Sequence, residues 1–212
     1  DSPFYFATQR PIGLPSFMTK ALFGLLGAGL GLFALFAWRG RPRPARPPSG
    51  GSRPYAASLV YFGCLGFGFI AVELALMQRL ILLLGHPIFT LAVLLCTLLA
   101  SGGLGSSWSG RVPMRRACVC VGALTVAYAF ALPPLVEALL PLSLAARIAV
   151  AVAVVAPLGL VMGMPFPQGL RRAGQGPMPA PPFYWGLNGI MSVVGSSVTM
   201  LLAVSVGFRA AM

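Results

Sequence analysis

Glu73 is the residue of this chain whose chemistry is hardest to explain by packing alone. It is one of only three acidic residues and lies in the run "GFGFIAVELALMQRLILLLGHP" (66–87), which is long and apolar enough to cross a membrane. A carboxylate near the bilayer midplane costs about 2.5–3.5 kcal/mol on insertion scales, so it should face other helices and have a polar partner. Arg79 is about 240° further around a helix and cannot pair with it. We expect a partner on another helix, with three candidates: Asn188, Ser192 and Ser196.

Two interpretations of Glu73 stay open. It is either a neutral, hydrogen-bonded carboxyl that fixes helix registry or a site that couples the movement of a proton or cation. The chain offers no Ser/His/Asp set, no paired carboxylates and no metal-ligand cluster. We therefore predict no catalytic, cofactor-binding or metal-binding residue in this chain. The single histidine, His86, stands beside Pro87 and is interpreted as a turn residue.

Composition indicates a membrane protein. The 212 residues are 58% hydrophobic and only 8% charged, with a mean hydropathy of +0.87, whereas soluble domains carry about 25% charged residues. The net charge of +12 could indicate a nucleic-acid partner, but the arginines form short clusters between apolar runs, as in multispan membrane proteins. The lipid bilayer is therefore the expected partner, and nucleic acid is not. The four cysteines lie in or beside apolar runs and are interpreted as small packing residues.

The apolar segments predict an all-α fold class: a polytopic membrane bundle of about six transmembrane helices. Their expected ranges are 18–38, 56–84, 88–107, 117–133, 142–164 and 183–207. Pro133-Pro134 is expected to end the fourth segment, and 167–182 to be a polar connection. The expected domains are an extramembrane linker (1–17), the first transmembrane helix (18–38), a basic Pro/Gly-rich cytoplasmic loop (39–54) and a five-helix transmembrane bundle (55–212).

Arginine placement predicts the orientation. The first, third and fifth connections carry arginine clusters, while basic residues on the opposite side stand singly. This pattern places the odd-numbered connections in the cytoplasm and the N-terminus outside. The predicted cytoplasmic ends also carry the aromatic residues of an interfacial belt: Trp38, Tyr55, Trp108, Tyr184 and Trp185.

Small residues indicate where helices approach closely. Gly24, Gly27 and Gly31 form a G-x-x-x-G face on the first segment. Because that segment lies outside the five-helix set, we expect it to be peripheral and to dock on a partner helix or subunit through Gly27 and Gly31. The stretch "ASGGLGSS" is not interpreted as a phosphate loop, since no Walker lysine follows it.

Three stretches resemble a known family. They are "GFGFIAVELALMQRLILLLGHPIFTLAVLLCTLLASGGLGS", "LGLVMGMPFPQGLRR" and "YWGLNGIMSVVGSSVTMLLAVSVGF". They look like the C-terminal membrane region of large bacterial spermidine-synthase-like membrane proteins, which resemble transporter-like helices fused to a domain of the spermine/spermidine synthase type. The opening "DSPFYF" is similar to the segment that links the two parts. The matching positions are Glu73, Gln78, Arg79, Gly85, His86, Pro87, Gly163, Pro165, Pro167, Asn188, Gly189 and Gly195.

The resemblance implies an integral protein of a bacterial inner (cytoplasmic) membrane. It also leads us to expect a structural motif at seven of these positions: Gln78, Arg79, Gly85, His86, Pro87, Pro165 and Pro167. The aminopropyltransferase-like domain is absent, and the family continues into one more helix after Phe208. The first residue is Asp1, and nothing near it resembles a signal peptide. We therefore expect a piece of a longer or processed chain, in which any synthase activity would belong to a missing domain.

The order of the second to sixth segments also matches a six-helix major-facilitator half without its last helix. The loop "GSSWSGRVPMRR" (105–116) looks like a weakened form of that superfamily's Gly-x-x-x-Asp-Arg-x-Gly-Arg-Arg loop, with Ser109 where the acid would be. A single half lacks the second repeat that would enclose a midplane site.

Three functions remain open. The first is a non-catalytic integral-membrane domain of a spermidine-synthase-like protein, which anchors or regulates a partner domain or complex. The second is a transporter-like half that moves a polyamine or other cation, with Glu73 as the coupling site. The third is an accessory structural subunit of a larger membrane complex. The expected partners besides lipid are other membrane subunits or a synthase-like domain, and no cofactor is expected. An outside N-terminus would place a preceding synthase-like domain outside too, where S-adenosyl cofactors are scarce.

Overall fold

The computed structural model describes residues 16–39, 55–174 and 181–210. Every element in these ranges is a helix: α1 (Ser16–Arg39), α2 (Tyr55–Leu84), α3 (Pro87–Trp108), α4 (Met114–Leu139), α5 (Leu144–Met162), α6 (Pro165–Ala173) and α7 (Pro181–Ala210). The predicted linker 1–17 and basic loop 39–54 fall almost entirely outside the described residues.

The helices have the length and composition of membrane spans. Five are long and apolar enough to cross a membrane: Ala56–Leu84, Pro87–Trp108, Met114–Leu139, Leu144–Ala173 and Pro181–Leu202. The sixth long helix, α1, has 24 residues and contains the shorter apolar stretch Phe23–Leu35. The prediction of an all-α polytopic membrane bundle is confirmed.

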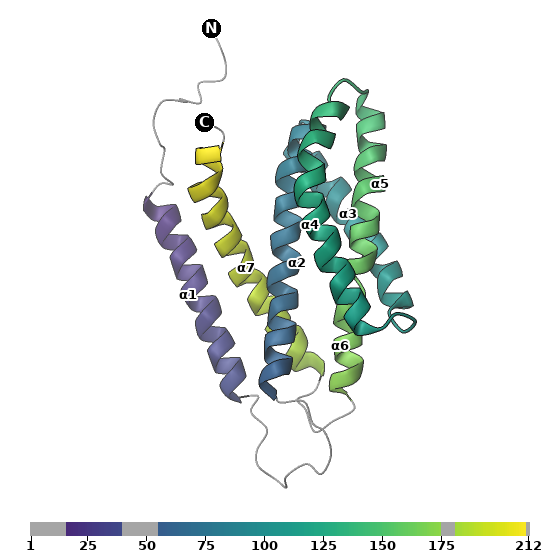
Figure 1. Ribbon diagram of the computed structural model, residues 1–212. Helices are drawn as coiled ribbons and strands as arrows, with labels where there is room; N and C mark the ends of the chain where they lie inside the picture. The colour runs from purple at the N-terminus through teal and green to yellow at the C-terminus, as the bar shows by residue number, and fades with distance from the viewer. Residues whose placement is uncertain (1–15, 40–54, 175–180, 211–212) are drawn as a thin grey trace.

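Successive long helices run in opposite directions, and α2 stands between two groups (Figure 1). The helices α1 and α7 lie on one side of α2, while α3, α4 and α5 lie on the other. The most extensive contacts join α2 to α7 and α3 to α5, followed by α1 with α7. The helix α1 therefore sits at the edge of the bundle.

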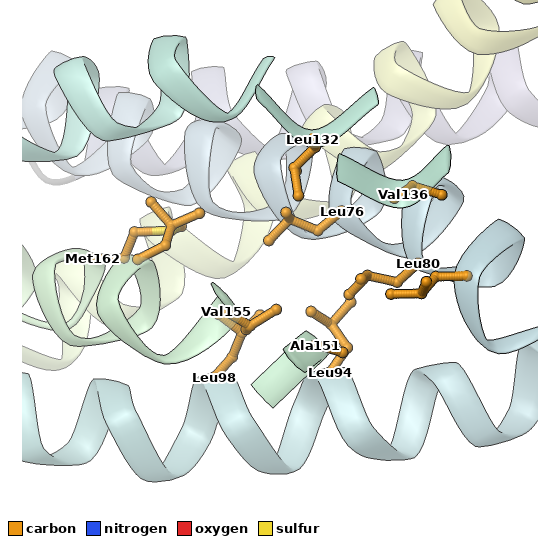
Figure 2. Packing of buried hydrophobic residues seen from close by; sticks show 11 residues of the cluster. Leu76, Leu80, Leu94, Leu98, Leu132, Val136, Ala151, Val155 and Met162 are labelled. Carbon is orange, nitrogen blue, oxygen red and sulfur yellow. The ribbon is translucent and has the colours of Figure 1, made fainter. Parts of the chain in front are cut away.

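Two apolar clusters hold these groups together. In the larger one, side chains of α2, α3, α4 and α5 converge (Figure 2); Leu132 of α4 points toward Leu76 of α2. The smaller cluster lies where α6 ends and α7 begins, around the stacked rings of Phe62 and Tyr184, whose centroids are 4.4 Å apart. The helix α2 contributes to both clusters, so it connects the two groups of helices.

Glycines allow α3 and α5 to approach until their backbones touch. A Cβ at Gly105 would overlap the carbonyl of Leu160, and a Cβ at Gly163 would overlap the backbone of Gly102. Helices in lipid associate through this kind of packing because burial from water contributes nothing between them. Within the "GGLG" stretch at 102–105, Gly102 and Gly105 therefore form a helix-packing surface.

Two predicted boundaries are wrong. The pair Pro133-Pro134 does not end the fourth segment, because α4 continues to Leu139. Proline inside a helix is tolerated in a membrane bundle where neighbouring groups satisfy the backbone, and here Leu132 and Val136 pack into the larger cluster on both sides of the pair. The expected connection 167–182 is also interrupted by α6.

The prolines of α6 fit the start of a helix. Pro165 and Pro167 occupy its first turn, where backbone N–H groups have no partner within the helix, so proline loses no hydrogen bond there. The apolar side of α6 then packs toward Phe62. A proline-rich sequence therefore predicted a connection where the structure has a short helix.

Two interpretations of side-chain environment are also wrong. Tyr184, assigned to an interfacial belt, is fully buried because its ring stacks on Phe62. The four cysteines, interpreted as packing residues, are all exposed on the helices. Their side chains therefore do not pack inside the described bundle.

Candidate functional site

Glu73 lies on the side of α2 that faces the bundle, between its two packed faces. Ile70, three residues earlier, contacts the Gly195 position of α7. Leu76, three residues later, belongs to the larger apolar cluster. At about 100° per residue, Glu73 falls between these two faces. Its side chain is half-buried.

The expected hydrogen bond between Glu73 and the polar stripe of α7 is not formed. Within residues 16–39, 55–174 and 181–210, Glu73 makes no hydrogen bond or ion pair. Ser192 Oγ instead donates to the carbonyl oxygens of Gly66 (3.1 Å) and Asn188 (3.0 Å). Ser196 Oγ donates to Val193 O in its own helix, at 2.9 Å.

The glycine at position 66 explains this outcome. A Cβ at Gly66 would overlap the backbone of Asn188, so the missing side chain lets α7 approach α2 at this level. Glu73 lies seven residues further along α2, about 10 Å away. The close approach at Gly66 therefore sets the register of α7 and keeps Asn188 and Ser192 out of reach of the carboxylate.

The segment Gly85-His86-Pro87 forms the tight turn between α2 and α3. Gly85 has φ +75°, a conformation that other residues rarely adopt. His86 is the exposed N-cap of α3, and Pro87 opens the helix. Thr90 Oγ1 donates to His86 O at 2.9 Å. The histidine thus contributes its backbone to the turn, and its side chain is exposed.

Arg147 connects this turn to the turn between α4 and α5. Its guanidinium donates to Leu83 O (3.2 Å), to Leu142 O (2.9 Å) and to Leu140 O. In the sequence, Arg147 is a lone basic residue, and it contributes only to the prediction of membrane orientation. Its clamp role depends on two distant turns meeting, which spacing along the chain does not reveal.

At the opposite end of the bundle, α6 is fastened to the α3–α4 connection. Gln168 Nε2 donates to Ser109 O (2.7 Å) and Val112 O (2.8 Å). Arg171 donates to Ser109 Oγ at 2.7 Å, and Tyr61 OH donates to Pro165 O at 2.7 Å. The serine in the weakened loop motif is thus a buried bracing residue. Gln168 was not among the predicted site residues, although an amide inside the otherwise apolar and basic "PFPQGLRR" is a signal in the sequence.

The same contacts bring the described arginine clusters to one end. Arg171 and Arg172 of α6 reach Ser109 and Met114, respectively. Arg111, Arg115 and Arg116 are exposed on the segment that contains these contact residues. The arginines of these two segments therefore lie at the same end of the bundle, as the orientation prediction requires.

The glycine face of α1 points away from the rest of the described chain. The helix contacts the bundle through a narrow stripe, Leu26, Gly29 and Phe33, and a Cβ on Gly29 would come within 2.6 Å of Val194 Cγ2. At Gly24, Gly27 and Gly31, no atom of the described residues lies within 4 Å of the position that a Cβ would take. Gly31 is two residues after Gly29, about 200° around the helix. The predicted docking role of Gly27 and Gly31 stays a prediction.

These features limit the chemistry. In the described parts of the chain, no three His, Cys, Asp or Glu side chains come together as metal ligands. The carboxylate of Glu73, which has no partner among the described residues, can take up a proton, bind a cation or receive a hydrogen bond from another polypeptide.

The fold and these sites define a polytopic integral membrane protein. The chain matches no protein-family model, no curated protein and no solved structure. The resemblance to spermidine-synthase-like membrane proteins and to a major-facilitator half therefore depends on sequence motifs alone.

Proposed function

We propose that this chain is the non-catalytic membrane domain of a spermidine-synthase-like protein, which anchors or regulates a partner domain or complex through α1. The family part of the proposal depends on the sequence resemblance. One observation carries the anchoring role: the Gly24, Gly27 and Gly31 positions of α1 are open, opposite the stripe that holds α1 to α7. Glycine in a helix costs about 1 kcal/mol relative to alanine. A small-residue face recovers this cost when a second helix packs on it.

The surroundings of the open face also suit a helix partner. Around it, α1 exposes large apolar side chains, including Phe23, Leu30 and Leu35. A helix that lies against Gly27 and Gly31 would be flanked by such side chains, which is the arrangement of a close helix pair. A separate subunit and a further segment of the same protein would both use this face, so the accessory-subunit function shares the same evidence.

Site-specific photo-crosslinking in intact membranes tests the docking role. A photoreactive residue at position 31 should form an adduct with another polypeptide segment, whereas one at position 122 of α4, which is equally open, should react with lipid. The identity of the adduct distinguishes a synthase-like domain from an unrelated subunit. If position 31 reacts only with lipid, α1 has no docking role.

A second candidate function is transport of a polyamine or other cation past Glu73. It is favoured by the half-buried carboxylate between α7 and the larger cluster, which has no partner in the described chain. In vesicles containing the protein, Glu73→Gln should abolish uptake of a labelled polyamine while the fold persists. Glu137→Gln, at an exposed acid of α4, is the matched control. Equal uptake by the wild type and Glu73→Gln would exclude this function.

We further propose that the domain lies in a bacterial inner membrane with its N-terminus outside. The support is the gathering of described arginines at the end that carries Ser109 and α6, because arginine-rich connections face the cytoplasm. In a background without native cysteines, Gly110→Cys should react with an impermeant thiol reagent only from the cytoplasmic side. His86→Cys should react only from outside, and the opposite pattern would reverse the orientation.

A further inference from the structure

A cleft separate from Glu73 opens on the outer surface of the bundle between α2 and α4, with α5 behind it. Its volume is about 420 Å³. Small side chains, Ala71, Ala75 and Ala129, line it and leave space that larger residues would fill. Its inner wall includes Leu76 and Leu132, which point toward one another (Figure 2). Ala75 and Ala129 are exposed, so the cleft opens toward the surrounding lipid.

The cleft has a polar end and an apolar body. Gln78 and Arg79 line the end nearer the α2–α3 turn; both are exposed, and neither side chain bonds to another described residue. Arg79 lies five residues before the end of α2, about 7.5 Å along the axis, a depth from which arginine reaches the interface. Ala71 lies about 12 Å deeper. Along this length the lining is apolar apart from Tyr128, whose hydroxyl donates to Val154 O at 2.6 Å, and the buried hydroxyl of Thr125.

No carboxylate of the described helices compensates the charge of Arg79. Glu73 lies six residues away, on a face of α2 about 120° from Arg79. Glu137 follows Leu132 by five residues, about 140° around α4 from the cleft. The other arginine near this end, Arg147, already donates to three backbone carbonyls. The cleft therefore has an unpaired cation, Arg79, at one end and an apolar lining along the rest of its length.

The shape of the cleft selects the kind of occupant. The cleft has a volume of about 420 Å³ and extends about 12 Å along the helix axis from Arg79 to Ala71. Its small and apolar lining suits one hydrocarbon chain. An anion at Arg79 would also gain a charge-assisted hydrogen bond, which is about twice as strong as a neutral one.

We propose that the cleft binds an anionic phospholipid, with its phosphate on the Arg79 guanidinium and one acyl chain between α2 and α4. The phosphate gives Arg79 the partner that the described chain does not supply. The acyl chain covers the small side chains of Ala71, Ala75 and Ala129. This site is independent of the docking role of α1 and of Glu73.

Native mass spectrometry of the purified full chain, with phosphatidylglycerol or phosphatidylcholine added as the probe, tests this assignment. The wild type should retain phosphatidylglycerol in preference to phosphatidylcholine. Arg79→Gln should reduce that preference roughly tenfold, because a hydrogen bond to a charged group is lost. Arg79→Lys keeps the positive charge and should retain most of the preference. Ala129→Leu should fill the cleft and reduce retention of both lipids.

Two controls match these variants. Arg115→Gln removes an exposed arginine at the other end of the bundle, and Ala127→Leu adds bulk on an exposed position of α4 outside the cleft; neither should change lipid retention. An unchanged preference in Arg79→Gln would overturn the proposal. Displacement of phosphatidylglycerol by inorganic phosphate would show a site for free anions instead. A dimer of the chain that Ala129→Leu dissociates would show that a second copy occupies the cleft.

Discussion

Glycines line both the α3–α5 interface and the outer face of α1, and the two regions differ in what these glycines meet. Between α3 and α5, Gly105 lies against the Leu160 carbonyl and Gly163 lies against Gly102, with no room for a methyl group. On α1, Gly27 and Gly31 have no described atom near the position that a Cβ would take. In one region the glycines pack against another helix of the same chain. In the other, no described part of the chain packs on them.

The difference shows that small residues can serve either the folding of one chain or its assembly with a partner. Lipid is as apolar as the helices, so a glycine face stabilises a bundle only where another backbone approaches it. The α3–α5 pair meets that condition within the chain. The outer face of α1 does not, and its glycines lower helix propensity without a contact in return. This contrast is the main support for a partner at α1.

The largest effect on stability is expected from Gly105→Ala. The new methyl group would overlap backbone atoms of Leu160, which cannot rotate away, so α3 and α5 must separate. Such overpacking costs about 1–3 kcal/mol, which corresponds to a loss of roughly 5 °C in the unfolding midpoint for a chain of this size. Thermal unfolding followed by circular dichroism in one detergent measures this change.

The control is Gly103→Ala, two residues away on the same helix, where no described atom lies within 4 Å of the added Cβ. Alanine should leave the midpoint unchanged or raise it slightly, because it favours the helix by up to about 1 kcal/mol. Equal midpoints for the two variants would show that α3 and α5 do not pack through Gly105.

A smaller effect is expected where α1 meets α7. In Gly29→Ala the new Cβ would lie 2.6 Å from Val194 Cγ2, the end of a side chain that can shift, so we expect a loss of about 1 kcal/mol. Val194→Ala removes that methyl group and should restore much of the loss. A coupling free energy of at least about 0.5 kcal/mol in the double-mutant cycle is expected. Strictly additive effects would show that the two residues are not in contact.

Much of the fold could be predicted from the sequence, because membrane spans are specified by length and hydropathy. The six long helices follow from apolar runs whose ends lie near the predicted ones. The errors occur where tertiary contacts outweigh local preference. Packing of Leu132 and Val136 carries α4 through Pro133-Pro134. Tyr184 stacks on Phe62 and is buried, so it does not lie at the membrane interface.

The candidate site was less predictable for the same reason. The sequence places Glu73 within a span, and its depth follows from the helix rise. The register between α2 and α7 depends on the close approach at Gly66, which no spacing along the chain encodes. Asn188 and Ser192 were therefore expected beside Glu73. Their contacts lie instead at Gly66, about 10 Å away along α2. The clamps made by Gln168 and Arg147 depend equally on distant segments that meet in space.

The paired substitution Gly27→Leu/Gly31→Leu should have the smallest effect on the stability of the chain itself. Both positions are open, and surface substitutions away from contacts usually change stability by less than about 0.5 kcal/mol. Gly103→Leu/Gly122→Leu adds the same bulk at two open positions of α3 and α4 and serves as the control.

The mass of the particle that carries this chain, extracted from its native membrane in a mild detergent, tests the docking role of α1 most directly. We expect the wild type and the control pair to share a mass larger than that of one chain. We expect Gly27→Leu/Gly31→Leu to reduce that mass while the unfolding midpoint of the chain is preserved. The same mass for all three proteins would contradict a partner at α1.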